Sequence, residues 1–325
     1  MSRFPIADST VLVTGGGGFV GSHVADQLLA RGAKKVIAVD NFVRGSRDNV
    51  VDAQKTGRFE LVEGDIRDRQ LVDDLTKGCD YVFHQAALRI TACAEDPRAG
   101  HEVMMDGSFN VFESAVRHKV KKIVAASSAS VYGEPDVLPI EETAAYNNRT
   151  LYGAAKIALE HYLRSFNDMY KLPYVALRYF NLYGPRMDMT GVYTEVMVRW
   201  MDRIDSGQAP VIFGKGDQSM DFIFIDDCAR ANLLALESDA SDDVFNVATG
   251  VETSLLDLCR MMLELMGRPN LEPEFVEERK VNPVRRRRAS TEKAKRLLGF
   301  ESNVDVRSGL EKLIAWRRAK KQQQA

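Results

Sequence analysis

The sequence has few cysteines and no long apolar run, and its positive and negative charges nearly cancel. Among its 325 residues, 44 lysines and arginines stand against 46 acidic residues, which gives a formal net charge of -2. This balance offers no general attraction to nucleic acid or to an anionic membrane. No apolar run reaches the roughly 18 residues that a membrane-spanning helix needs. We therefore expect neither nucleic acid nor a membrane as a partner.

The four cysteines, Cys79, Cys93, Cys228 and Cys259, are scattered and form no Cys-x-x-Cys pair. This distribution predicts neither a disulfide framework nor a zinc site. The histidines also lack the spacing of metal ligands, so no metal site is expected. The N-terminus leads directly into a strand-like segment without a signal-peptide pattern, and we therefore expect a cytoplasmic protein.

What the sequence does contain is an alternation of β-branched apolar runs with helical patterns. Strands are predicted at 10–15, 35–40, 59–65, 81–87, 122–128 and 174–181. Helices are predicted between them, most clearly over 20–32, 104–120 and 152–171. Alternating strands and helices form a parallel sheet with right-handed crossovers and helices on both faces. The sequence therefore predicts an α/β fold with a Rossmann-type, doubly wound parallel sheet.

The regular alternation stops after residue 183, which predicts a smaller C-terminal lobe. Two further helices are expected over 191–207 and 254–267. A helix and a strand within 221–249 are expected to return to the large sheet. We therefore assign 1–182, with 221–250 returning to it, to the sheet domain, and 183–220 and 251–325 to the smaller lobe.

The segment TGGGGFVG places Gly15, Gly18 and Gly21 directly after the first predicted strand, where a helix begins. Glycine lets backbone N–H groups approach a pyrophosphate at the helix N-terminus, where the helix dipole favours an anion. Asp40 ends the second strand, 19 residues after Gly21, and can accept hydrogen bonds from an adenosine ribose. Its charge would repel a 2′-phosphate, which favours NAD over NADP, although Arg44 leaves NADP open.

A tyrosine and a lysine, Tyr152 and Lys156, lie one helical turn apart in the segment YGAAK. A free phenol has a pKa of about 10. A neighbouring ammonium and a positive nicotinamide ring would favour its phenolate. Tyr152 could then take a proton from a sugar hydroxyl as hydride leaves the same carbon. Ser127 and Ser128, at the end of another strand, offer hydroxyls that could hold the reacting oxygen.

Several segments together resemble the extended short-chain dehydrogenase/reductase superfamily. Besides Asp40, they are TGGGGFVG, GDIRD, HQAA, SSASVYG, YGAAK, RYFNLYGPR and DFIFIDD. More narrowly, the chain resembles the nucleotide-sugar epimerase/dehydratase branch, typified by UDP-glucose 4-epimerase. The resemblance covers almost the whole chain. It implies NAD as cofactor, a nucleotide-sugar substrate of the UDP type bound by the smaller lobe, and a homodimer formed through helices near 98–118 and 152–170.

The resemblance also implies roles for individual residues. Its catalytic residues are Ser128, Tyr152 and Lys156. Its cofactor-binding residues are Gly15, Gly18, Phe19, Val20, Gly21, Asp40, Asn41, Arg44, Gly45, Asp65, Ile66, Gln85, Ala86, Ala87, Arg89, Ser127, Tyr152, Lys156 and Phe180. Its substrate-binding residues are Ser128, Asn181, Thr194, Val211, Phe213, Arg286 and Arg287. Val211 and Phe213 are expected near the base and the two arginines near the diphosphate. Arg287 also falls near the position that limits sugar size, where a cation would favour an acidic sugar.

Residues 129 and 130 bear on which reaction the chain supports. Dehydratases of this branch have Asp-Glu directly before Val-Tyr-Gly, and the uronic acid decarboxylases usually have Glu at the second position. Here the residues are Ala129 and Ser130. Without this second acid–base pair, the resemblance implies 4-epimerisation of a UDP-hexose, such as UDP-glucose, or of a UDP-uronate through a 4-keto sugar. A dehydratase, decarboxylase or reductase remains an alternative, as does a non-catalytic NAD-binding sensor.

Overall fold

The computed structural model describes residues 3–188, 196–277 and 284–324. Its centre is a sheet of seven parallel strands in the order β10-β6-β5-β4-β1-β2-β3. The strands are β1 Thr10–Thr14, β2 Lys35–Asp40, β3 Phe59–Glu63, β4 Tyr81–His84, β5 Lys122–Ser128, β6 Tyr174–Tyr179 and β10 Asp243–Val247. The predicted α/β class with a doubly wound parallel sheet is confirmed.

The strand order reverses between β1 and β4. The chain runs outward from β1 through β2 to β3, then returns to β4 on the other side of β1 and continues through β5 and β6. The loops that leave β1 and β4 therefore separate in opposite directions at the carboxyl edge of the sheet. In an open α/β sheet, such a reversal creates the crevice in which ligands bind.

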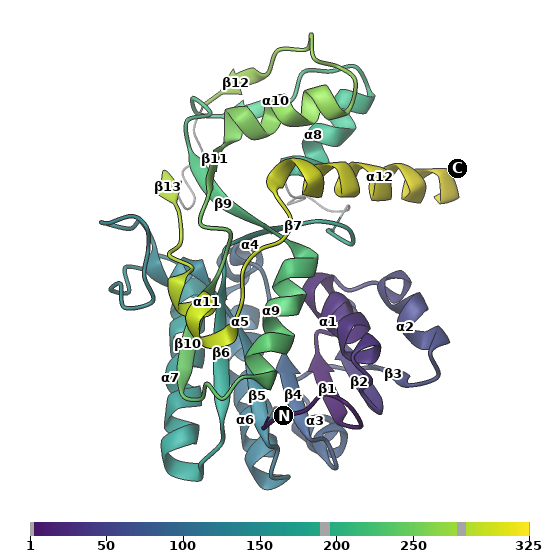
Figure 1. Cartoon of the computed structure of the whole chain (residues 1–325), viewed down its shortest axis with the longest axis vertical. Coiled ribbons are helices and arrows are strands. Elements are labelled where there is room, and N and C mark those ends of the chain that lie inside the picture. Colours follow the sequence, from purple (N-terminus) through teal and green to yellow (C-terminus); the bar gives the residue numbers. More distant parts are fainter. Residues whose placement is uncertain (1–2, 189–195, 278–283, 325) are drawn as a thin grey trace.

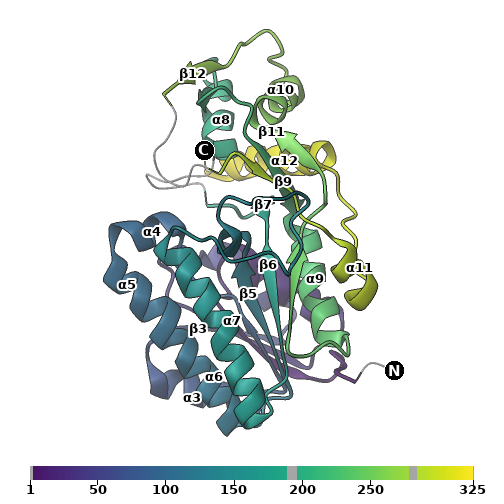
Figure 2. The same ribbon diagram turned by 90° about the vertical axis from the view of Figure 1, so that its left-hand side faces the viewer.

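Helices cover both faces of this sheet (Figures 1 and 2). One face carries α1 Phe19–Ala30, α2 Val51–Lys55 and α9 Ile225–Glu237, and the other carries α3 Arg69–Thr76, α6 Ser108–Arg117 and α7 Leu151–Tyr170. Because side chains alternate along a strand, Val11 and Val13 pack in the core on the α1 side, whereas Leu12 packs on the α6 and α7 side. This two-sided burial explains why the strands have continuous apolar sequences.

The helix expected over 104–120 is more complex than the sequence suggested. Two short helices, α4 Ile90–Glu95 and α5 Pro97–His101, precede a π-helical stretch at Glu102–Gly107 that leads into α6. The wider turns of the π-helix place Gly107 against Ile66, where an added Cβ would come within 2.7 Å of the isoleucine side chain. The π-helical stretch before α6 therefore packs closely on the loop after β3.

The smaller lobe lies above the carboxyl edge of the large sheet in Figure 1. Its strands are β7 Asn181–Tyr183, β8 Val211–Phe213, β9 Ser219–Phe224, β11 Glu252–Ser254, β12 Glu274–Val276 and β13 Arg286–Arg287. Its helices are α8 Val196–Asp205, α10 Leu255–Leu265, α11 Glu292–Leu298 and α12 Val306–Gln324. Strands β7, β9, β11 and β13 form one sheet, and β8 pairs with β12. Figure 1 shows α11 lower down, beside β10 of the large sheet.

Two expectations for this part of the chain need adjustment. Within 221–249, α9 and β10 join the large-sheet domain, but residues 221–224 belong to β9 in the smaller sheet. Of the helix expected over 191–207, residues 196–205 form α8, and 191–195 lie outside the described residues. Over the described ranges, no helix has the length and hydropathy needed to cross a bilayer.

Candidate active site

A cavity of about 680 Å³ opens at the carboxyl ends of the central strands and extends up to the smaller lobe. Its floor is formed by the residues that end or follow β1, β2, β4, β5 and β6. From the smaller lobe, β7, α8, β9, α10 and β13 contribute to the lining, with Met220 and Phe222 of β9 and Leu255 of α10 among these residues. The cavity therefore occupies the crevice that the reversal of strand order creates.

The glycine turn after β1 has no room for side chains. Gly15 has a φ of +68°, and a Cβ there would lie 2.8 Å from the backbone nitrogen of Ala86. A Cβ on Gly21 would lie 2.2 Å from the carbonyl oxygen of Gly15. The turn thus keeps its backbone exposed to the cavity at the start of α1, as a pyrophosphate-binding turn requires.

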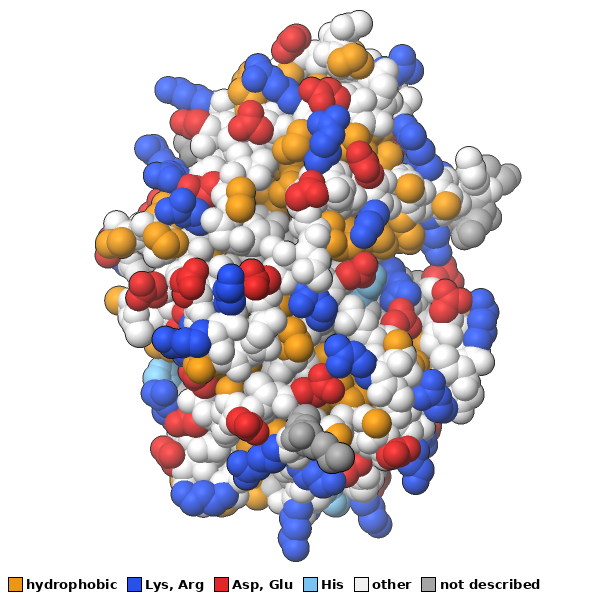
Figure 3. All heavy atoms as spheres, in the orientation of Figure 1, with side chains coloured by type: hydrophobic (Ala, Val, Ile, Leu, Met, Phe, Trp, Pro, Cys, Tyr) orange, Lys and Arg blue, Asp and Glu red, His pale blue; other side chains and the backbone are white. Residues whose placement is uncertain are grey.

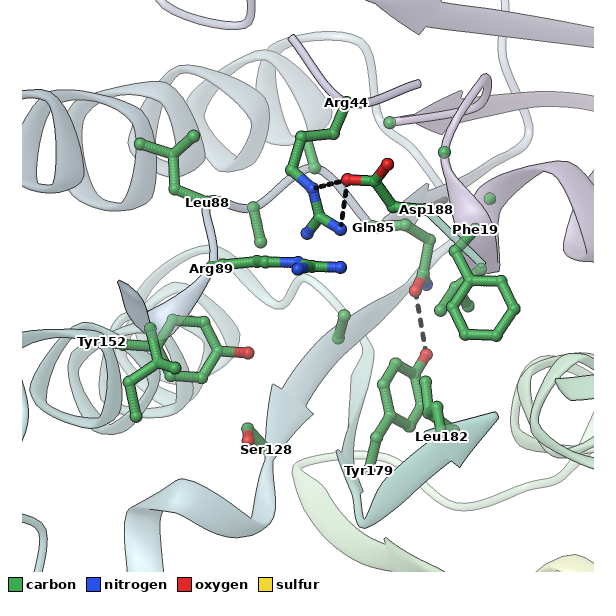
Figure 4. Close-up of a pocket in the computed structure, with 18 of the residues that line it drawn as sticks. Phe19, Arg44, Gln85, Leu88, Arg89, Ser128, Tyr152, Tyr179, Leu182 and Asp188 are labelled. Carbon is green, nitrogen blue, oxygen red and sulfur yellow. Dashed lines mark hydrogen bonds and ion pairs between the residues drawn. The ribbon is translucent and has the colours of Figure 1, made fainter. Parts of the chain in front are cut away.

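Asp40 at the end of β2 is held by this turn. Its carboxylate accepts hydrogen bonds from the backbone N–H groups of Gly17 at 3.0 Å and Phe42 at 2.8 Å. Burial raises the pKa of Asp40, and these backbone N–H groups oppose the rise. Arg44, whose charge left NADP open, forms an ion pair with Asp188 at 3.2 Å across the cavity (Figure 4).

The loop after β3 supplies a second fixed carboxylate. Asp65 accepts hydrogen bonds from Asn41 Nδ2 and from Arg67 Nη2, both at 2.9 Å. The Arg67 guanidinium lowers the pKa of Asp65 to about 2, so this carboxylate is charged at neutral pH. Ile66 beside it is buried and also lines the cavity. The sequence predicted Asn41, Asp65 and Ile66 on the adenosine side, and the structure brings them together.

At the other end of the cavity, Tyr152 on α7 lies beside Ser128 at the end of β5 (Figure 4), and Lys156, one turn further along α7, also lines the cavity. The hydroxyl of Thr150 accepts a hydrogen bond from Gly153 N at 3.1 Å, which caps the helix directly before Tyr152. The Ser128 hydroxyl donates a hydrogen bond to Ser130 Oγ at 3.1 Å and lines the cavity together with Tyr152. Lys156 Nζ donates to the carbonyl oxygen of Ala126 at 2.6 Å and lies 5.7 Å from the centre of the Tyr152 ring.

The two titratable side chains do not form a phenolate by themselves. Burial raises the pKa of Tyr152 to about 12, and the nearby Ser128 hydroxyl only partly opposes this effect. Burial also lowers the pKa of Lys156 to about 8. Desolvation is therefore the largest effect on the pKa of Tyr152. A further positive charge beside the phenol, such as an oxidised nicotinamide ring, is needed to bring its pKa down.

Glu160, which the sequence analysis did not single out, anchors the same helix face one turn beyond Lys156. Its carboxylate accepts hydrogen bonds from Ser127 Oγ at 2.5 Å and from Arg178 Nη2 at 2.7 Å. The Glu160 and Arg178 side chains are only 3% and 2% exposed. This buried ion pair ties α7 to β5 and β6. The repeat of Tyr152, Lys156 and Glu160 at intervals of four residues was the signal that could have identified it.

The structure separates the predicted site residues into two groups. All predicted cofactor-binding and catalytic residues line the cavity, as do Asn181 and Arg287. Val211, Phe213 and Arg286 are not among its described lining residues. The Val211 carbonyl instead accepts a hydrogen bond from Trp200 Nε1 at 2.7 Å, and Arg286 pairs with Glu252 at 2.6 Å. Thr194 lies outside the described residues.

Several lining residues were not predicted from the sequence. They include Ser130, Tyr179, Leu182, Arg186, Asp188, Arg199 and Met220. Tyr179 and Leu182 directly flank the predicted pair Phe180 and Asn181, so their position was the available signal. Tyr179 is held below the cavity by hydrogen bonds of 2.9 Å to both Gln85 and Asn232.

No three His, Cys, Asp or Glu side chains of the described segments gather in a way that could hold a metal ion. The face in Figure 3 shows acidic and basic side chains interspersed over both lobes.

Comparison with known proteins identifies the family. A model of the NAD dependent epimerase/dehydratase family matches residues 11–248, which include the glycine turn, Asp40, Ser128, Tyr152 and Lys156. The chain belongs to this family. NAD is the cofactor of the family, and the chain is an NAD-dependent enzyme of the extended short-chain dehydrogenase/reductase group.

The similarity to individual relatives extends over nearly the whole chain. A UDP-glucose 4-epimerase from Mycolicibacterium smegmatis is 34% identical over 314 residues, which are 96% of this chain and 99% of the relative. The structure of a UDP-N-acetylglucosamine 4-epimerase from Methanobrevibacter ruminantium, in complex with UDP-N-acetylmuramic acid, is 32% identical with a TM-score of 0.91. That alignment covers 97% of this chain and 99% of the other.

A UDP-glucuronic acid 4-epimerase from Bacillus cereus was solved with UDP-glucuronic acid and NAD. It is 27% identical with a TM-score of 0.88, and the alignment covers 96% of this chain and 99% of the other. Nucleotide-sugar decarboxylases and dehydratases also match. The comparisons therefore identify the family and the cofactor, whereas relatives at comparable sequence identity are named for different reactions.

The residues of the cavity fit NAD. The backbone-lined turn at Gly15–Gly21 would hold the pyrophosphate, because added Cβ atoms at Gly15 and Gly21 would collide with neighbouring backbone. Asp40 would accept hydrogen bonds from the adenosine ribose, and Asp65 and Ile66 would lie beside the adenine. At the opposite end, Tyr152 and Lys156 would stand beside the nicotinamide half.

Proposed function

We propose that the chain is a nucleotide-sugar 4-epimerase. The observation that carries this proposal is that Ser128 and Tyr152 line the same end of the cavity, and that Ala129 and Ser130 follow Ser128. A dehydratase or decarboxylase needs a further carboxylate at these two positions to move a second proton, and the chain has none there. The relatives that are named 4-epimerases support the same reaction.

NAD, when bound, supplies an acceptor for hydride from C4 of the sugar and then a donor for its return. Tyr152 takes the proton of the 4-hydroxyl group as this oxygen becomes a carbonyl, and gives a proton back when the opposite epimer forms. Ser128 donates a hydrogen bond to the same oxygen and keeps it beside the phenol. Lys156 holds its ammonium beneath the Tyr152 ring through its bond to Ala126 O.

Inversion at C4 requires the 4-keto sugar to present both of its faces to the same hydride donor. The sugar must therefore turn over within the cavity between the two transfers. The cavity of about 680 Å³ also has to hold the dinucleotide. Its walls around the sugar end combine small side chains, such as Ala126 and Ser130, with flexible Met220.

We further propose UDP as the nucleotide carrier, the lobe of 183–220 and 251–325 as its binding region, and the cytoplasm as the location. The names of the relatives support the carrier. The cysteines of the chain, all free and buried, support a reducing compartment. Val211 and Phe213 remain assigned to the base only through the resemblance, because they do not line the cavity.

The test is to incubate the NAD-loaded protein with UDP-glucose, UDP-galactose, UDP-glucuronate and the corresponding GDP- and dTDP-sugars, and to identify products by NMR. Epimerisation at C4 without loss of water or carbon dioxide supports the proposal. Loss of either identifies a dehydratase or a decarboxylase. NAD binding without any turnover identifies a sensor. The Tyr152→Phe variant should retain NAD but lose turnover by at least about 100-fold, in line with the usual contribution of general base catalysis.

We also propose a homodimer formed through α6 and α7. The two helices carry exposed apolar side chains, namely Phe109 on α6 and Leu151, Tyr162, Met169 and Tyr170 on α7. Phe109 and Tyr162 stack edge to face at 5.8 Å, so the two helices present one continuous apolar face. Light scattering on the protein and on Phe109→Glu tests this, with a dimer expected for the former and a monomer for the latter. A monomeric parent protein would refute it.

A further inference from the structure

Arg287 is a buried cation on the wall of the cavity. It lies on β13, its side chain is only 7% exposed, and it is among the cavity-lining residues. Its Nη2 donates a long hydrogen bond of 3.4 Å to the carbonyl oxygen of Gly133. Its Nε is buried and has no hydrogen-bond partner among the residues that the structure describes. A guanidinium has five N–H donors, so most of its hydrogen-bonding capacity is left for something inside the cavity.

Within the described segments, the charge of Arg287 also has no ion-pair partner. No carboxylate of the described segments lies within 4.0 Å of it, whereas Arg186 on the cavity wall pairs with Asp26 at 2.7 Å. Glu134 is the acidic group that influences Arg287, but its carboxylate accepts a hydrogen bond from the backbone N–H of Arg285 at 3.0 Å. Burial lowers the pKa of Arg287 to about 10, which still leaves it charged at neutral pH.

A buried charge without a counter-ion is unfavourable, and a protein retains one mainly where a ligand supplies the opposite charge. The position of Arg287 indicates which part of the ligand this is. Gly133, which Arg287 contacts, ends the short helical turn at Ala129–Tyr132 that follows Ser128 directly. At a rise of about 2 Å per residue, the five-residue step from Ser128 to Gly133 covers about 10 Å.

A second contact places the strand at the same end of the cavity. Just after Arg287, the backbone of Arg288 and Ser290 is hydrogen-bonded to Ile140, in the segment that joins the Ser128 strand to the Tyr152 helix. Arg287 and the residues that follow it are thus in contact with the segment between Ser128 and Tyr152, and not with the glycine turn on β1. On a hexose, a carboxylate at C6 is attached to C5, the carbon next to the reacting C4.

We propose that Arg287 binds a carboxylate carried by the sugar, so that the preferred substrates are nucleotide-linked acidic sugars such as uronic acids. This inference rests on the proposed function. A guanidinium can hold a carboxylate through two parallel hydrogen bonds, which fixes the orientation of the sugar as well as neutralising the charge. A neutral hexose would leave the buried guanidinium without an anion, and sites built for a charged partner reject analogues that lack it.

Binding measurements separate this inference from the reaction itself. In the NAD-loaded Tyr152→Phe variant, calorimetry should give UDP-glucuronate a dissociation constant about 10- to 100-fold lower than that of UDP-glucose, as expected for a charge-assisted hydrogen-bonded pair. Combining Tyr152→Phe with Arg287→Met should remove most of this difference, because only the binding of UDP-glucuronate should become weaker. Arg287→Lys should restore part of it, because the charge returns without the two-pronged geometry.

Arg285→Gln provides a matched control. Arg285 lies two residues away, is exposed and does not line the cavity, so its replacement should leave the preference unchanged. Turnover completes the comparison: kcat/KM for UDP-glucuronate should exceed that for UDP-glucose and fall about 10- to 100-fold in Arg287→Met. Bound NAD and the melting temperature establish that each variant is folded. If Arg287→Met does not fold, the comparison uses Arg287→Lys.

Three results would overturn the inference. The first is a preference of the parent protein for the neutral sugar. The second is an equal loss of affinity for both nucleotide sugars in Arg287→Met, which would indicate that Arg287 binds the diphosphate that they share. The third is an unchanged preference in Arg287→Met. If acidic sugars bind through Arg287 but no substrate is epimerised at C4, the proposed reaction fails while the carboxylate site stands.

Discussion

Replacing Glu160 with alanine would remove the counter-ion of a buried guanidinium beneath the active site. The Glu160 carboxylate contacts Arg178 through Nε at 2.9 Å and Nη2 at 2.7 Å, and both side chains are almost fully buried. Removing one member of such a pair typically costs about 3–5 kcal/mol. The hydroxyl groups of Ser127 and Tyr146 would also lose their bonds to this carboxylate.

The loss should fall near the lower end of this range. Arg178 Nη1 still donates to Tyr132 OH and to the carbonyl oxygen of Glu142, both at 2.8 Å, so its charge is partly solvated by the protein. We therefore expect the free energy of unfolding to fall by about 3 kcal/mol, a large share of the roughly 5–15 kcal/mol of a typical protein.

Urea titration followed by circular dichroism measures this change, with Glu113→Ala as the control. Glu113 pairs with Arg69 on the surface, where the side chains are 34% and 64% exposed, and exposed pairs contribute at most about 1 kcal/mol. If Glu160→Ala is no more destabilising than Glu113→Ala, the buried pair does not hold α7 to the sheet as we describe.

Three further predictions concern the cofactor turn and two buried titratable groups. Gly21→Ala should abolish NAD binding in a fluorescence titration, because its Cβ would lie 2.2 Å from Gly15 O; near-normal affinity would contradict the close turn. Burial lowers the pKa of His84 to about 3, so between that value and about 6.5 the unfolded chain binds a proton that the folded chain does not. Unfolding free energy should therefore decrease as pH falls from 6.5 towards 3, and less steeply in His84→Gln; parallel curves would refute this. Burial lowers the pKa of Lys156 to about 8, so stability should rise with pH from about 8 to 10.5. Lys156→Met should lose that rise in denaturation curves at pH 8, 9 and 10, and an unchanged rise would count against it.

The two ends of the cofactor site could be predicted from the sequence because each depends on local pattern. The glycine turn, Asp40 and the Tyr152–Lys156 pair are encoded by short spacings within one strand–turn–helix or one helical turn. Ligands of a parallel α/β sheet bind at the edge where its strands end. The predicted order of strands and helices therefore also identified which residues lie at that edge. The resemblance extended this to Asn41, Asp65 and Gln85, which all line the cavity.

Contacts between distant segments could not be predicted in this way. Glu160 was missed because its role depends on Arg178, 18 residues further along and on another element. The deep burial of Tyr152, which raises its pKa, could not be predicted either, because a sequence does not state how deeply a side chain is buried. The segment at 221–224 was assigned to the large sheet, although its strand partners are β7, β11 and β13.

The sequence by itself determined that this chain forms a parallel α/β sheet with a glycine turn for NAD and a tyrosine one turn before a lysine. The tertiary structure decided which of two adjacent arginines reaches the cavity. Successive residues on a strand point to opposite sides, so Arg286 turns outward to Glu252 while Arg287 turns inward. Which of the two faces inward depends on the register of β13 against β9, where Arg287 lies opposite Met220. That register joins segments more than 60 residues apart, and no local pattern in the run of arginines specifies it.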